Sequence, residues 1–178
     1  MGIQEPITLL RRFFSGLAEH TFQVRLGVVD PPMIEYVGTL LLRFIRADQP
    51  RLPSPPMGRP RLDLDRLLMA AEPRGGAARR ELHRQIGDFA LYWTGLFPES
   101  LRRRHAPSDL DWYHSYCLLG KRAYLIASEI EAPDDAAPGA LLERLGQHFE
   151  MCAYGLREIR RAWETPEPGS GPSAFLIS

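Results

Sequence analysis

Histidine is the residue type in this chain with the widest range of possible chemistry. Four of the five histidines fall on different stretches of helical periodicity, on or beside the apolar face of each stretch. Imidazole groups that project from facing helices are one way in which helical bundles hold iron, zinc or haem. The candidate metal ligands are therefore His20, His83, His114 and His148.

The residues around these histidines do not form a known metal motif. Di-iron bundles carry Glu-x-x-His on two of their helices, and this sequence has no such motif. The sequence closest to this motif runs from Asp111 to His114, with aspartate in place of glutamate. Asp111 is better explained as part of a helix cap. Metal or haem binding by a bundle enzyme or sensor is therefore the alternative hypothesis, and no cofactor is favoured.

Asp88 is the second residue of interest because it immediately precedes the apolar run 89–97. On a helical wheel it lies on the side of Tyr92, opposite Phe89. A carboxylate in a dry place near tyrosines is a candidate acid or base, so the catalytic candidates are Asp88, Tyr92 and Tyr116. The preferred interpretation is structural: Asp88 pairs with Arg84, or bonds to a residue of the next helix.

Motifs of the large enzyme families are absent from the sequence. It has no glycine-rich phosphate loop, no GxSxG and no HExxH. The arginine clusters near residues 79–84, 102–104 and 157–161 lack an interleaved RNA-binding motif, and the formal net charge is zero. Nucleic-acid binding is therefore not expected.

Composition indicates an ordinary soluble domain, since 44% of the residues are hydrophobic and 25% are charged. The longest apolar run, 89–97, is far shorter than the roughly 20 residues that span a bilayer. The N-terminal residues do not resemble a signal peptide, so a cytoplasmic location without membrane contact is expected. Cys117 and Cys152 lie on apolar helix faces, which predicts two buried, reduced thiols.

The elements that must position these residues are helices. The clearest is predicted over 141–163, where apolar residues recur at steps of three and four and form one stripe. Asp30 followed by Pro31 predicts a helix start, and Gly27 predicts the end of the helix before it. The stripe residues of 141–163 are Leu142, Leu145, Phe149, Cys152, Leu156, Ile159 and Trp163.

The resulting fold prediction is all-α: a single-domain bundle of four long helices and one or two short ones. The alternating residues of 22–28 also fit a strand, but the helix signals on both sides are stronger. Five prolines make 48–61 a long crossover between helices. The predicted helices cover residues 6–26, 31–46, 62–71, 77–97, a segment that starts at Ser108, and 141–163.

The predicted domain covers residues 1–163, and a Pro- and Gly-rich tail with an apolar tip follows over 164–178. An apolar tip on a linker is suited to docking on a second copy or on another protein. The leading hypothesis is therefore a non-enzymatic module that binds a protein partner or self-associates. The partner-binding candidates are Phe175, Leu176 and Ile177.

Overall fold

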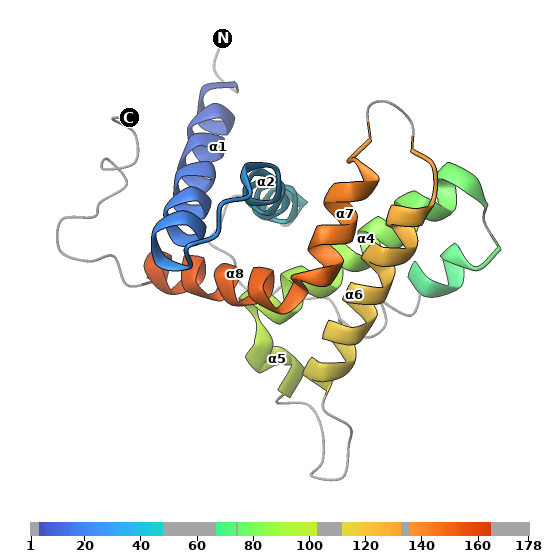
Figure 1. The fold of residues 1–178 in the computed structure, drawn as a ribbon. Coiled ribbons are helices and arrows are strands. Elements are labelled where there is room, and N and C mark those ends of the chain that lie inside the picture. The colour runs from blue at the N-terminus through green and yellow to red at the C-terminus, as the bar shows by residue number, and fades with distance from the viewer. Residues whose placement is uncertain (1–3, 48–66, 74, 103–111, 133–135, 165–178) are drawn as a thin grey trace. The chain divides into compact units, whose positions relative to one another are not determined.

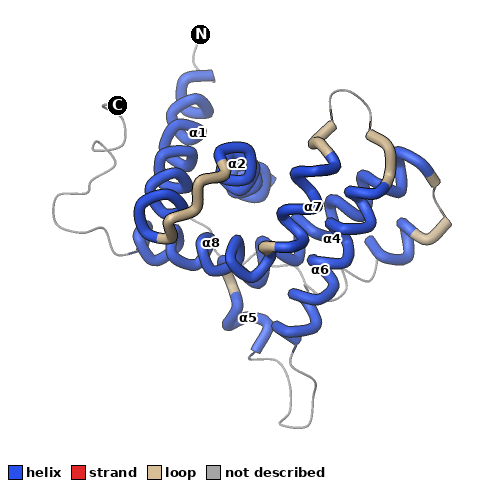
Figure 2. The backbone as a smooth tube through the Cα atoms, viewed as in Figure 1, coloured by secondary structure: helices blue, strands red, loops and turns tan. Residues whose placement is uncertain are grey.

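The computed structural model describes residues 4–47, 67–73, 75–102, 112–132 and 136–164. Throughout these residues the regular structure is helical, and none of it is a strand (Figure 2). The all-α prediction is confirmed, and the strand alternative for 22–28 is wrong. No helix among the described residues is both long and apolar enough to cross a bilayer.

The chain divides into two compact units, one formed by residues 1–54 with 154–178 and the other by residues 55–153. The single domain over 1–163 and the four-helix bundle arrangement stay predictions. Three predicted features lie outside the described residues: the proline-rich crossover 48–61, the helix start at Ser108, and the tail with Phe175, Leu176 and Ile177.

The first unit begins with two helices that pack against each other, α1 (Gln4–Glu19) and α2 (Pro31–Ala47) (Figure 1). The helix predicted over 6–26 is present, but its last part is the π-helix η1 (His20–Arg25). Gly27 then adopts φ 67°, a left-handed conformation that glycine adopts without strain. Asp30 caps α2, because the amide of Met33 donates to its Oδ1 at 3.2 Å.

The second unit contains α4 (Gly76–Leu96), α5 (Pro98–Arg102), α6 (Trp112–Glu129) and α7 (Gly139–Gln147). Helix α6 packs against both α4 and α7, and Figure 1 shows the three side by side. The polar first half of α4 is exposed or half-buried, except for the buried Arg80. Its second half is buried on nearly all sides, so this part of α4 forms the centre of the unit.

The predicted helix 141–163 is in fact two helices, α7 and α8 (Phe149–Glu164), with His148 between them at φ −108° and ψ 27°. Periodicity misses the break because Leu145 and Phe149 are still four residues apart. The stripe itself is confirmed, since its six members from Leu142 to Ile159 are fully buried. Trp163 completes it in the first unit, where its ring packs against that of Phe14 at 5.2 Å.

Two close contacts between glycines and aromatic rings fix the packing of the second unit. A Cβ atom on Gly87 would lie 2.7 Å from the ring of Tyr124, and one on Gly120 would overlap the ring of Phe149. Both rings are fully buried. The atoms that approach Gly120 belong to the side chains of Phe149 and Ala90. Cys117 and Cys152 are buried free thiols, as predicted.

Candidate functional site

The four candidate metal ligands form no metal site in the part of the chain that the structure describes. His20, His114 and His148 are exposed, and His83 is half-buried. Within the described ranges, no group of three histidine, cysteine, aspartate or glutamate side chains is placed to hold a metal ion. The structure therefore gives the metal hypothesis no preformed site in this part of the chain.

His114 belongs to a charged surface group with Lys121 and Glu150. Burial raises the pKa of Glu150, but the Lys121 ammonium, which donates to its Oε1 at 2.8 Å, a backbone hydrogen bond and the charge of His114 outweigh this and lower the pKa. Glu150 is exposed, as expected from its position off the apolar stripe. The group is a solvated ion pair, and such pairs contribute little to stability.

Asp88 is buried and ties α4 to α6. The Tyr124 hydroxyl donates to Asp88 Oδ1 at 2.7 Å, and Arg84 Nη1 lies 2.5 Å from Asp88 Oδ2. Arg84 also contacts Glu81 one turn earlier. These contacts support the structural interpretation of Asp88, with the predicted arginine as its partner. The tyrosine of α6 that reaches Asp88 is Tyr124, two turns beyond the predicted Tyr116.

The other two catalytic candidates are core residues. Tyr92 is 1% exposed, and its ring packs edge-on against Phe97 at 5.6 Å and Trp93 at 6.2 Å. Tyr116 is 3% exposed. An acid or base role for Asp88, Tyr92 and Tyr116 stays a prediction.

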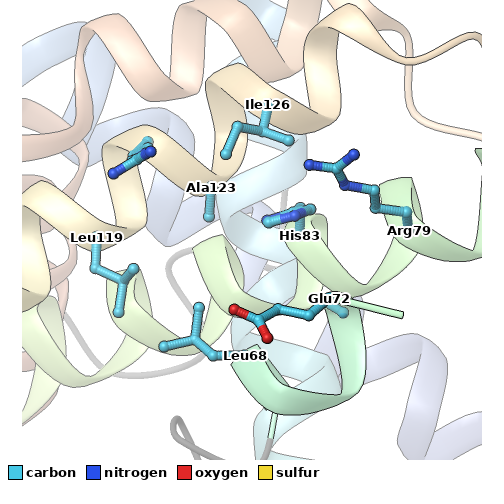
Figure 3. Close-up of a pocket in the computed structure, with 9 residues that line it drawn as sticks. Leu68, Glu72, Arg79, His83, Leu119, Ala123 and Ile126 are labelled. Carbon is cyan, nitrogen blue, oxygen red and sulfur yellow. The ribbon is translucent and has the colours of Figure 1, made fainter. Parts of the chain in front are cut away.

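A pocket of about 360 Å³ lies elsewhere in the second unit, between the helical segment 67–71, the first half of α4 and the face of α6 (Figure 3). Figure 3 shows Glu72, Arg79 and His83 around the same space. We call it the Arg–His pocket. Its lining residues are Leu68, Ala71, Glu72, Arg79, His83, Leu119, Arg122, Ala123 and Ile126.

Helix geometry explains why these side chains meet. Arg79 and His83 are four residues apart on α4, so they project from one face. The residues that α6 contributes recur at steps of three and four, so they share the face of α6 that is turned toward α4. The apolar members among them are Leu119, Ala123 and Ile126.

Positive charge is concentrated around His83. Burial lowers the pKa of His83 below its usual value, and the guanidinium groups of Arg79 and Arg122 lower it further. Its Nδ1 atom is buried, without a hydrogen-bond partner among the described residues. Two arginines thus act on His83, and Glu72 is the acidic residue among the nine that line the pocket.

From the sequence, His83 is grouped with histidines on other helices as a metal candidate, and that role stays a prediction. The four-residue spacing of Arg79 and His83 was the local signal that these two side chains lie on one face of α4. Arg122 carried no signal of its own, since its position opposite α4 depends on how the two helices pack.

In comparisons with known proteins, the chain matches no family model, no curated protein and no solved structure.

Proposed function

We propose that this chain is a non-enzymatic helical binding module whose ligand enters the Arg–His pocket. The observation that carries the proposal is the pocket itself, in which two arginines act on His83 and five of the nine lining residues are aliphatic. Ligand sites in proteins combine an apolar lining with a few convergent polar groups, and this pocket has that composition. The absence of the large families' catalytic motifs from the sequence supports binding rather than turnover.

The first prediction is that small-molecule ligands bind at this pocket and leave chemically unchanged. A fragment library screened by NMR against the ¹⁵N-labelled chain should shift the amide signals of Arg79, His83 and Arg122. Leu119→Trp places a larger side chain into the pocket and should abolish these shifts. Leu118→Trp is the matched control, because Leu118 is 53% exposed and does not line the pocket. Hits that persist in Leu119→Trp, or that are turned over, would contradict the proposal.

Protein binding through the tail is the second candidate function. Phe175, Leu176 and Ile177 follow the Pro- and Gly-rich stretch 165–173, and three consecutive large apolar residues favour contact with another protein surface. The partner would be a second copy of this chain or a different protein, and the pocket does not depend on either.

The second prediction follows from this candidate. Removal of residues 165–178 should change the oligomeric state measured by sedimentation equilibrium, or abolish binding to an identified partner. Replacing Phe175, Leu176 and Ile177 by serine should have the same effect, because the apolar side chains supply the contact. An unchanged mass together with unchanged partner binding would contradict a role for the tail.

A further inference from the structure

We infer that the Arg–His pocket selects a small organic acid that carries one carboxylate on an apolar body. This inference rests on the proposed function, because it assumes that the pocket is the binding site. It goes further by stating which chemical class the pocket accepts and which it rejects. Each part of the pocket contributes one element of that selection.

Three side chains form the part of the pocket that would bind the carboxylate of the ligand. Arg79 and Arg122 come from different helices, yet both act on His83, so their electrostatic fields overlap at the imidazole. A guanidinium group presents two parallel donors that match the two oxygens of a carboxylate. An anion beside His83 would therefore meet two permanent charges and an imidazole whose buried Nδ1 forms no hydrogen bond with the described residues.

The aliphatic residues that line the pocket would contact the apolar body of the ligand. Five of the nine lining residues are aliphatic, and they come from both the 67–71 segment and α6. A volume of about 360 Å³ lies at the small end of the range for ligand sites, so the body must be short. Inorganic anions would leave this aliphatic surface without contact. The five residues are Leu68, Ala71, Leu119, Ala123 and Ile126.

Glu72 provides the selection against a second negative charge. Its carboxylate is drawn among the pocket side chains in Figure 3, below His83 and away from Arg79. The far end of a dicarboxylic acid would meet this like charge, whereas an aliphatic end would not. Monocarboxylates should therefore bind more tightly than dicarboxylates of the same length.

Binding should also be linked to proton uptake at His83. The charged groups that line the pocket around it are Arg79 on its own helix, Arg122 on α6 and Glu72. Burial and the two arginines lower the pKa of the free imidazole, and a bound carboxylate favours the imidazolium form. The pKa of His83 is thus higher in the complex than in the free protein. The affinity for the anion should therefore rise as the pH falls through the pKa that His83 has in the complex, and a comparison of about pH 8 with about pH 6 measures this rise.

The third prediction tests this inference by calorimetric titration of the full chain with hexanoate, glutarate and hexylamine. Hexanoate should bind, glutarate should bind more weakly, and hexylamine should not bind. Arg79→Gln with Arg122→Gln should weaken hexanoate binding about tenfold or more. Arg11→Gln with Arg12→Gln removes the same charge from exposed positions of α1 and should leave it unchanged. Glu72→Gln should improve glutarate binding while hexanoate binding stays the same.

The outcomes separate this inference from the proposed function. Equal binding of hexanoate to the two double variants, or equal binding of hexylamine and hexanoate, would overturn the carboxylate selection. Hexanoate affinity that is the same at pH 8 and pH 6 would place the anion away from His83 and overturn the geometry. If uncharged fragments bind in the pocket and hexanoate does not, the inference fails and the proposed function stands. If no fragment binds there, both fail.

Discussion

Replacing Arg80 by alanine should lower the free energy of unfolding by about 3–5 kcal/mol. Arg80 is 2% exposed, which is unusual for an arginine. Its Nε donates to the carbonyl of Ile130 at 3.0 Å and its Nη2 donates to the carbonyl of Ala137 at 2.5 Å. Ile130 follows α6 and Ala137 precedes α7, so one guanidinium satisfies the chain on both sides of this connection. Alanine would remove both donors and leave a cavity.

Urea unfolding followed by circular dichroism measures this effect. Arg80→Lys should retain part of the stability, because an ammonium keeps the charge but lacks the planar fork that reaches two carbonyls. Arg11→Ala serves as the control, since Arg11 is exposed on α1 and its loss should change the free energy of unfolding by less than about 0.5 kcal/mol. A loss below about 1 kcal/mol for Arg80→Ala would show that the buried guanidinium is not a structural link.

Replacing Asp88 by alanine should lower the free energy of unfolding by about 3 kcal/mol. The change would leave the buried Tyr124 hydroxyl without the acceptor it has at 2.7 Å, and would remove a carboxylate 2.5 Å from Arg84. Tyr124→Phe should cost less, about 1 kcal/mol, because Asp88 keeps its contact with Arg84. Both residues are buried, so solvent can replace little of what is lost.

A double-mutant cycle isolates the bond between Asp88 and Tyr124. The variant with both Asp88→Ala and Tyr124→Phe should be more stable than the sum of the two single losses implies, by about 1 kcal/mol. Asp88→Asn should be milder than Asp88→Ala, since an amide oxygen still accepts from the tyrosine. Strictly additive losses would mean that the two side chains do not share a stabilising contact, and would count against the structural interpretation of Asp88.

Local signals in the sequence were sufficient to predict several helix boundaries and the buried faces of the helices. Gly27, Asp30 and the stripe from Leu142 to Ile159 each depend on neighbours within a few residues, so the helix boundaries and buried faces could be derived. The break at His148 could not, because the apolar spacing continues across it. The π-helical turns after Glu19 also gave no signal, since the same residues fit an ordinary helix.

The site was only partly predictable, because it depends on the register between helices. The Arg84–Asp88 pair lies within one helix and follows from the four-residue spacing. Tyr116 and Tyr124 share a face of α6, and periodicity does not say which of them lies level with Asp88. The same uncertainty concealed Arg122, which meets Arg79 and His83 only when α6 packs on α4 in the observed register.

The glycine–ring contacts have a consequence for how this sequence can change over evolutionary time. Gly87 and Gly120 each occupy the space beneath a fully buried ring, so a side chain at either position is tolerated only if the ring opposite becomes smaller. Substitutions at Gly87 and Tyr124, and at Gly120 and Phe149, should therefore appear together in descendants of this chain rather than singly. The two positions of each pair would then change together, although they lie 37 and 29 residues apart in the sequence.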